Sequence, residues 1–325
     1  MVIFEEIENK SLWNSEIVGK SNFNPYQIYE WGEYKKDMGW QVISIKANNN
    51  GKIAYLQITY KLKFNIFVGW CIGSIAGDIN IFSKDSLIEY LKLKFNIKYV
   101  LIKSNFTNTL DFNESISLYT SGWQKSYRKL NSDYTIYVDL NKSMDELLSS
   151  CSSNFRKNIK RGLKNNNTIK VAKIGNYDEK VIADLFNRFK IIKDVSLPEI
   201  NEIKYIKDNL SNNIIIATSE VNSQIVGLRA FLFHGNKALD FWATTDEVGR
   251  KNYTSYMLLF ELFKEAKNMG IESYDMSGID PVQNSNVFSF KNGLRAKTSE
   301  KLGEWELCNS ALISYLINNI YLRNK

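Results

Sequence analysis

The segment around Lys291 is the part of the chain whose residue types most suggest chemistry. A predicted strand that carries Asp275 ends in the turn Gly278-Ile279-Asp280-Pro281, and a second predicted turn, Phe288-Ser289-Phe290-Lys291-Asn292-Gly293, holds the lysine. A lysine supported by aromatic residues can present its ammonium to an oxyanion or a phosphate. The structural alternative makes Lys291 the polar tip of a surface turn and Asp280 a turn former, and the residues alone favour that alternative.

A second candidate is a basic helix. Phe155, Ile159 and Leu163 recur at i, i+4 and i+8, which predicts one apolar stripe that packs on the protein. From Cys151 to Lys173 there are seven basic residues and no acidic one. The basic side chains that would face an anion, such as RNA phosphates, are Arg156, Lys157, Lys160, Arg161 and Lys164. The alternative is a solvated helix face, which is the usual explanation of a charge run.

The third candidate is the polar segment Gly249-Arg250-Lys251-Asn252-Tyr253-Thr254-Ser255, which opens a predicted helix over 256–268. A polar loop before a helix offers backbone N–H groups and the positive end of the helix dipole to an anion. Arg250 and Lys251 add positive charge. Polar helix entrances are common, so a purely structural role is the alternative.

Near the N-terminus an aromatic and basic cluster suits stacking on a sugar or a base. Its members are Trp31, Tyr34, Lys35, Lys36 and Trp40. Packing of the tryptophans in a core explains the cluster equally well.

The composition bounds the class of protein. The chain has 325 residues, and 42 basic against 35 acidic side chains give a net charge of +7, which permits an anionic substrate without selecting one. Three scattered cysteines and a single histidine predict neither a disulfide framework nor a metal site. The acidic start lacks the pattern of a signal peptide, and no apolar stretch is long enough to span a membrane. These features predict a cytoplasmic protein.

The chain contains an internal similarity. A turn and alternating strand at Ile53 match a turn and strand at Ile225, 172 residues later. A helix leading into a strand at Ile97 matches the same pattern at Ile271, 174 residues later. Helices alternating with hairpin-linked strands indicate an α/β, or α+β layered, fold with a mixed sheet in each copy.

The boundary between the copies is predicted near residue 140. A strong strand over 134–140 precedes Ser143-Met144-Asp145-Glu146, whose Ser-x-x-Glu spacing is a capping box at a helix start. The predicted domains are therefore 1–140 and 141–308. A short C-terminal helix in 309–325 could pack back on the first domain.

Taken in order, these motifs resemble the FemABX family, the peptidoglycan-bridge aminoacyltransferases and their relatives, which have two GNAT-like acyltransferase domains. The resemblance runs from about residue 25 to 307. The segments that carry it are Trp31 and Lys36, Gly122-Trp123, Tyr137-Val138-Asp139-Leu140, the helix from Phe155 to Arg161, Tyr274-Asp275-Met276-Ser277-Gly278-Ile279, and 288–293.

The resemblance implies two tandem GNAT-like domains and an N-acyl or aminoacyl transferase. Lys36 would hold a phosphate of a nucleotide- or lipid-linked acceptor, and Lys291 would stabilise the oxyanion formed when an amine attacks an acyl carbonyl. The other residues expected at the substrates are Trp31, Arg250, Tyr253, Tyr256 and Asp275. No His or Glu stands out as a base, so the candidates that accept the proton of the amine are the substrate itself, a backbone carbonyl and an aspartate such as Asp280.

The donors of the family are chiefly aminoacyl-tRNAs, and the basic helix is suited to RNA phosphates. No cofactor is expected to be bound permanently. The chain departs from the family in having no room for a coiled-coil arm and in lacking the second glycine, and the aromatic after the first glycine, in the turn at Lys291. The acceptor therefore stays open between a peptidoglycan peptide and an amino sugar of a surface polysaccharide.

Two alternatives remain. One is acyl transfer from an acyl-CoA, although the segment 249–254 lacks the later glycines of a usual CoA-binding loop. The other is a non-catalytic RNA-binding module that uses the basic helix. The expected partners are an envelope precursor and tRNA, without DNA, and peripheral membrane contact is compatible with a lipid-linked acceptor. The oligomeric state stays open.

Overall fold

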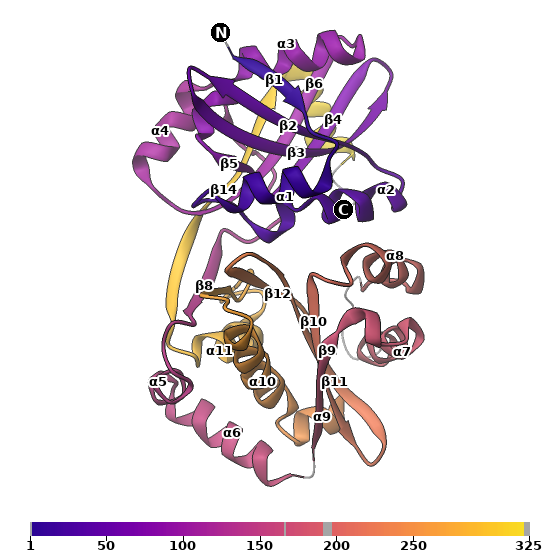
Figure 1. Ribbon diagram of the computed structural model, residues 1–325, viewed down its shortest axis with the longest axis vertical. Helices are drawn as coiled ribbons and strands as arrows, with labels where there is room; N and C mark the ends of the chain where they lie inside the picture. The colour runs from indigo at the N-terminus through magenta and orange to yellow at the C-terminus, as the bar shows by residue number, and fades with distance from the viewer. Residues whose placement is uncertain (1, 166, 191–196, 322–325) are drawn as a thin grey trace. The chain divides into compact units, whose positions relative to one another are not determined.

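The computed structural model describes residues 2–165, 167–190 and 197–321 of the chain (Figure 1). The chain divides into two compact units. Unit 1 consists of Met1–Asp133 with Glu300–Lys325, and unit 2 consists of Tyr134–Ser299. Each unit has its own mixed sheet and its own hydrophobic core.

Unit 1 is a sheet in the order β1-β2-β3-β4-β6-β14, in which β4 and β6 are parallel and the other neighbours are antiparallel. Its strands are β1 Ile3–Glu6, β2 Gln41–Asn49, β3 Lys52–Lys63, β4 Ile66–Ile72, β5 Ile75–Gly77, β6 Tyr99–Thr109, β7 Gln124–Lys125 and β14 Lys297–Cys308. Its helices are α1 Lys10–Val18, α2 Tyr29–Asp37, α3 Lys84–Phe95, α4 Phe112–Thr120 and α12 Ala311–Leu316, followed by a π-helical turn Ile317–Tyr321.

The core of unit 1 lies where α3 covers the sheet. Leu87 and Leu91, one helical turn apart on α3, are fully buried together with Ile58 of β3 and Ile102 of β6. The helix ends at Asn96, whose left-handed backbone, with φ of 50°, forms the C-cap. This end confirms the sequence-based prediction of a helix that stops near Asn96 before a strand.

Unit 2 repeats this plan with the order β9-β10-β11-β12-β13-β8, in which β12 and β13 are parallel. Its strands are β8 Tyr134–Asp139, β9 Thr168–Lys173, β10 Ile214–Val221, β11 Gln224–His234, β12 Lys237–Thr245 and β13 Ser273–Asp275. Its helices are α5 Met144–Ser150, α6 Ser153–Lys164, α7 Glu179–Lys190, α8 Ile200–Leu210, α9 Glu247–Lys251, α10 Thr254–Asn268 and α11 Ser285–Asn292. Figure 1 shows α7 and α8 on one face of this sheet and α10 on the other.

The two units follow the same path. In unit 1 three antiparallel strands, β2 to β4, lead through α3 into the parallel strand β6; in unit 2 the strands β10 to β12 lead through α10 into β13. The segments matched by sequence, at Ile53 and Ile225 and at Ile97 and Ile271, occupy corresponding places in the two paths. The predicted α/β layered fold with two copies of one unit is confirmed.

The compact units divide the chain after residues 133 and 299, whereas the sequence predicted 140 and 308. The reason lies in the pairing of two strands. Strand β8 runs antiparallel to β13 in unit 2, and β14 runs antiparallel to β6 in unit 1. Each sheet is thus completed by a strand that sequence order assigns to the other copy. The predicted capping box of α5 is confirmed, because Ser143 Oγ and the Glu146 side chain bond reciprocally to each other's N–H groups.

Candidate active site

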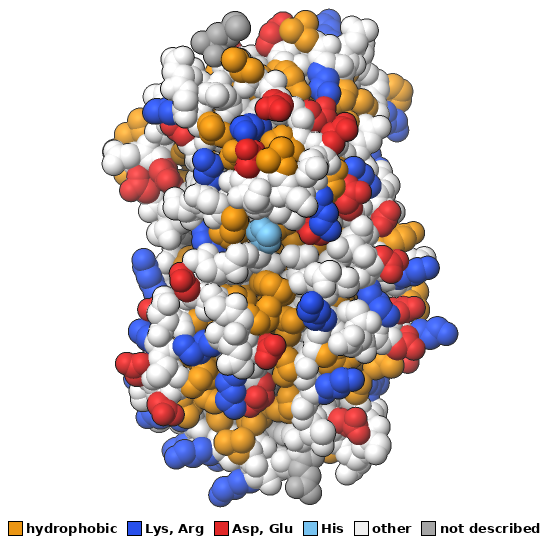
Figure 2. All heavy atoms as spheres, in the orientation of Figure 1, with side chains coloured by type: hydrophobic (Ala, Val, Ile, Leu, Met, Phe, Trp, Pro, Cys, Tyr) orange, Lys and Arg blue, Asp and Glu red, His pale blue; other side chains and the backbone are white. Residues whose placement is uncertain are grey.

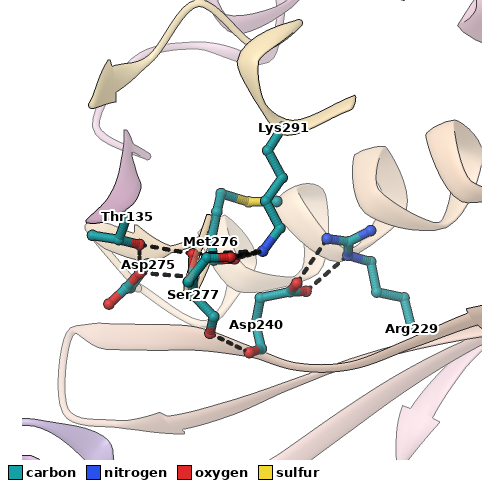
Figure 3. Close-up of polar contacts among 8 residues, drawn as sticks. Thr135, Arg229, Asp240, Asp275, Met276, Ser277 and Lys291 are labelled. Atoms are coloured by element: carbon teal, nitrogen blue, oxygen red, sulfur yellow. Dashed lines mark hydrogen bonds and ion pairs between the residues drawn. The ribbon is translucent and has the colours of Figure 1, made fainter. Parts of the chain in front are cut away.

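Lys291 lies in the helix α11, not in the turn predicted from sequence. The helix packs against the rest of unit 2 through Phe290. The ring centre of Phe290 lies 5.0 Å from that of Tyr256 and 5.6 Å from that of Phe155. Lys291 is 7% exposed. Its Nζ donates to the carbonyl oxygens of Met276 at 2.5 Å and Gly278 at 2.9 Å (Figure 3). The alternative in which Lys291 is the tip of a surface turn is wrong, because aromatic packing and these carbonyls hold the lysine inside.

The loop that offers these carbonyls is itself fixed by side chains. Asp275 is 8% exposed and its Oδ1 accepts hydrogen bonds from the Ser277 backbone N–H, at 2.8 Å, and from the Thr135 hydroxyl. Ser277 has a left-handed backbone, with φ of 60°, and its hydroxyl donates to the Asp240 carbonyl oxygen at 2.5 Å (Figure 3). Asp275 therefore positions the loop under Lys291.

A pocket of about 490 Å³ opens beside Lys291. Four residues predicted from sequence line it together: Arg250, Tyr253, Tyr256 and Lys291. Its wall also contains Thr254 of the predicted polar segment and residues that sequence reasoning missed, among them Arg229, Asp240 and Thr244. The pocket has the size and the mixed apolar and polar lining of a small-molecule site.

Arg229 and Asp240 form a buried ion pair in this wall. Arg229 donates from Nε and from one terminal nitrogen to the two oxygens of Asp240, both at 2.8 Å (Figure 3). Its guanidinium lies 5.2 Å from the Phe290 ring centre. Burial, with the neighbouring Asp240 charge, raises the pKa of Tyr274 well above its usual value. The sequence contains a signal for this pair, because one basic and one acidic residue interrupt the apolar runs Leu228–Phe233 and Ala238–Trp242. Charged residues are rarely buried unless they are paired.

The entrance of α10 differs from the open polar loop that was predicted. The helix α9 occupies most of the segment, and a Cβ on Gly249 would lie 2.4 Å from the Val226 carbonyl oxygen, so glycine allows this helix to pack closely. Tyr253 then takes a left-handed backbone, with φ of 60°, and starts α10 without a side-chain cap. The buried hydroxyls of Thr244 and Thr254 have no hydrogen-bond partner among the residues that the structure describes.

The basic helix is α6, as predicted, but its apolar stripe differs. Phe155 and Ile159 are buried as expected, whereas Leu163 is 65% exposed. Gly162 takes the inner position instead, because a Cβ there would lie only 2.6 Å from Met257 Cγ of α10. The prediction for Leu163 is wrong because the close approach of two helices, not apolarity, selects the residue at this crossing.

The basic residues of α6 do not all face solvent. Lys157, Lys160, Arg161 and Lys164 are exposed, and Figure 2 shows basic side chains along the edge formed by α6. The fifth, Arg156, donates from one terminal nitrogen to the carbonyl oxygens of Ser149, at 2.8 Å, and Cys151. Arg156 therefore caps the C-terminal end of α5.

Trp31 and Lys36 lie on α2 of unit 1. Trp31 is 6% exposed and packs edge-on against Tyr26 and Tyr34, with ring centres 4.6 and 5.1 Å away. Lys36 is partly exposed and forms an ion pair with Glu33 at 2.7 Å. Burial works to lower the pKa of Lys36, but the hydrogen bond and charge of Glu33 outweigh it, so the pKa is raised.

Asp280 has the geometry of a turn former. Its Oδ1 accepts from the N–H groups of Val282 and Gln283, both at 2.8 Å. It is not among the residues that line the pocket beside Lys291. Its role as a proton acceptor stays a prediction.

In the described ranges, 2–165, 167–190 and 197–321, no three His, Cys, Asp or Glu side chains cluster as a metal site would require. None of the described helices has the length and hydropathy needed to cross a membrane.

Comparison with known proteins agrees with this architecture. The FemAB family model matches residues 199–321. A solved structure described as FemX aligns with 97% of this chain and 100% of its own, with a TM-score of 0.82 at 16% identity. A tandem GNAT protein from the clavulanic acid biosynthesis pathway aligns with 95% of this chain and 99% of its own, with a TM-score of 0.58 at 8% identity.

The C-terminal domain of a protein described as a lysylphosphatidylglycerol synthetase, from Agrobacterium fabrum, also aligns, over 96% of each chain, with a TM-score of 0.61 at 11% identity. No curated protein matches the sequence. At such identities the solved structures show the fold, which is a tandem of GNAT-like units, and the family model agrees with the resemblance drawn from the motifs. Residues 199–321 are thus similar to the FemAB family, and the chain as a whole shares the fold of FemX.

Proposed function

We propose that this FemAB-like enzyme transfers an amino acid from an aminoacyl-tRNA to an amine on a nucleotide- or lipid-linked precursor of the cell envelope. The observation that carries the proposal is the ammonium of Lys291, which the Met276 and Gly278 carbonyls hold in the wall of the 490 Å³ pocket. The FemAB family match supports the reaction class.

In the proposed reaction the acceptor amine attacks the ester carbonyl that joins the amino acid to the tRNA. A C–N bond forms, the ester C–O bond breaks, and the ribose oxygen leaves with a proton. Negative charge develops on the carbonyl oxygen in the transition state, and the Lys291 ammonium stabilises it. Because Lys291 is 7% exposed, little water screens this interaction. Asp280 is the proposed acceptor of the proton that the amine loses.

The pocket offers further polar contacts to the bound group. The hydroxyls of Thr244 and Thr254 are buried in its wall and find no partner among the described residues. Buried polar atoms in native proteins are almost always hydrogen-bonded. We therefore assign these two hydroxyls to polar atoms of a substrate, with the uncapped start of α10 beside them.

The basic helix supports tRNA as the source of the amino acid. Lys157, Lys160, Arg161 and Lys164 are exposed on α6, a helix without an acidic residue. Arg161 also donates to the Tyr253 hydroxyl at 3.2 Å, and Tyr253 lines the pocket. A tRNA whose phosphates bind α6 would have its acceptor end within reach of Lys291.

We propose that unit 1 contributes to binding of the acceptor. Lys36 is partly exposed on α2, where a phosphate of the acceptor could replace Glu33 as its partner. Trp31 of the same helix packs against Tyr26 and Tyr34. The acceptor itself is either a peptidoglycan peptide or a polysaccharide amino sugar.

The proposal is tested by following a radiolabelled amino acid from charged tRNA onto nucleotide-linked peptidoglycan peptide and, separately, onto a nucleotide-linked amino sugar. Transfer to either, lost when the tRNA is deacylated or Lys291 is changed to Met, is the expected result. A parallel assay supplies acetyl-CoA as the donor in place of charged tRNA. Transfer from acetyl-CoA with none from charged tRNA would contradict the proposed donor and favour the acyl-CoA alternative.

A further inference from the structure

One hexapeptide, Lys-Leu-Lys-Phe-Asn-Ile, occurs twice in unit 1, at residues 61–66 and 92–97. The first copy forms the tip of the β3–β4 hairpin, and the second ends α3 and leads into β6. The first copy contacts the residues that directly follow the second, because the N–H groups of Lys98 and Tyr99 both donate to the Asn65 carbonyl oxygen, at 3.2 and 3.1 Å. Figure 1 shows the hairpin beside the end of α3. Residues 61–66 and 92–98 thus form one continuous surface, here called the hairpin surface.

The hairpin surface exposes apolar side chains. Phe64 is 84% exposed, Leu93 is 76% exposed and Leu62 is 39% exposed. Phe64 and Asn65 both have left-handed backbones, with φ of 51° and 62°, which makes the tip of the hairpin a tight turn. Single exposed apolar residues are ordinary, but three such residues, at the end of β3, at the hairpin tip and near the end of α3, form a patch of the kind that marks an interaction site.

The charge of the hairpin surface is strongly positive. It carries five lysines, no arginine and no acidic residue: Lys61, Lys63, Lys92, Lys94 and Lys98. Two carboxylates from outside it reach these lysines, since Glu89 pairs with Lys92 at 3.2 Å and Glu6 with Lys94 at 2.5 Å. The Lys63 ammonium lies 5.1 Å from the Phe64 ring centre, so a positive charge lies beside the apolar tip. The surface remains cationic after both ion pairs are counted.

We propose that the hairpin surface docks unit 1 on an anionic lipid bilayer. Apolar tips ringed by lysine suit such an interface, because Phe64 and Leu93 would enter the acyl boundary while the lysine ammonium groups stay at the headgroups. RNA explains the surface less well. Leu62 and Leu93 have no aromatic face on which a base could stack, and arginine, the residue favoured at nucleic acids, does not occur there.

This proposal does not rest on the transfer reaction, since it concerns a surface of unit 1 that lines none of the pockets discussed above. If both hold, docking would bring the enzyme to a lipid-linked acceptor. Each can fail without the other, because vesicle binding and amino acid transfer to a water-soluble acceptor are measured separately.

The test is co-sedimentation of the full-length protein with vesicles of phosphatidylcholine alone and of phosphatidylcholine with phosphatidylglycerol. We expect binding only to the anionic vesicles, weakened by added salt. Phe64→Ser with Leu93→Ser should lower the partition coefficient about tenfold or more, because two apolar insertions are lost. Lys63→Gln with Lys98→Gln should lower it about thirtyfold.

Matched controls use sites of equal exposure elsewhere. Phe112→Ser changes a phenylalanine that is 77% exposed on α4, between Asp111 and Glu114, and Lys180→Gln with Lys204→Gln removes two exposed lysines of unit 2. Both should bind like the original protein, and thermal unfolding should show that every variant folds. The proposal is overturned if anionic vesicles bind no protein, if the hairpin variants bind as well as the controls, or if the hairpin surface binds RNA and not vesicles.

Discussion

Arg161 of the basic helix lies against Tyr253 of the pocket wall, with its guanidinium carbon 5.5 Å from the ring centre and a hydrogen bond of 3.2 Å to the hydroxyl. Tyr253 is also the residue whose left-handed backbone starts α10. The contact therefore joins the surface proposed for tRNA to the pocket that contains Lys291. A phosphate that binds Arg161 would alter the wall of this pocket directly.

Replacing Lys157 and Lys160 together by Gln should weaken tRNA binding and flatten its dependence on salt. Each phosphate contact contributes about 0.7 to the slope of log affinity against log salt for a single strand, so losing two should reduce the slope by about 1.4. Filter binding across a salt series measures this. The double change Lys180→Gln with Lys204→Gln is the control, and equal slopes for the two double variants would refute a role of α6 in RNA binding.

The buried pair of Arg229 and Asp240 should be costly to break from one side. Arg229→Met leaves the Asp240 carboxylate buried without its partner, which should lower the free energy of unfolding by about 3–5 kcal/mol. Arg229→Met with Asp240→Leu should lower it by much less, because no charge is stranded. Urea unfolding measures both.

The partly exposed pair of Lys264 and Glu261, with N and O atoms 2.7 Å apart, supplies the control for that comparison. Lys264→Met should change the free energy of unfolding by less than about 1 kcal/mol, since solvent screens the pair. A loss as large as that of Arg229→Met would show that burial does not set the cost.

Gly162→Ala should destabilise the protein although alanine favours helices. The new Cβ would lie 2.6 Å from Met257 Cγ, so α6 or Met257 must move, at a cost of about 1–2 kcal/mol. Leu163→Ala, at a neighbouring position that is 65% exposed, should change the free energy of unfolding by about 0.5 kcal/mol or less. If the order of the two effects were reversed, the sequence-based stripe through Leu163 would be right after all.

Position 162 illustrates what sequence could and could not predict. Local signals were sufficient for the capping box of Ser143 and Glu146, for the end of α3 at Asn96 and for the basic helix, because each depends on residues within a few positions. The residues on the inward face of α6 depend on the distance between α6 and α10. The spacing of apolar residues along α6 does not determine that distance.

Long-range pairing is the other limit. The strands β8 and β14 complete the sheets of units 2 and 1, and this exchange moves both domain boundaries although each strand is locally evident. Likewise Arg229 and Asp240 are separate charges in sequence and become one ion pair only through the register of β11 and β12. Four residues that line the pocket were nonetheless predicted from sequence, because the family resemblance implied that they bind the substrates: Arg250, Tyr253, Tyr256 and Lys291.

Asp280→Asn separates two roles of one side chain. Asparagine can still accept the N–H groups of Val282 and Gln283, so the turn should persist and the unfolding midpoint should stay within a few degrees. If Asp280 accepts the proton of the amine, the rate of transfer should fall about 100-fold or more, since a general base typically contributes that much. An unchanged rate at every pH would leave Asp280 as a turn former alone.

The rate of amino acid transfer in Lys291→Met measures the proposed stabilisation of the oxyanion by the Lys291 ammonium. Methionine keeps the length of the side chain but removes the ammonium and leaves the Met276 and Gly278 carbonyls without its donation, which should cost about 1–3 kcal/mol of stability. Thermal unfolding first establishes that the variant is folded, with the exposed Lys297→Met as the matched control. We expect the turnover number for transfer from charged tRNA to fall about 100- to 1000-fold in Lys291→Met and to be unchanged in Lys297→Met. A folded Lys291→Met protein that transfers the amino acid at nearly the original rate would contradict a catalytic role of Lys291.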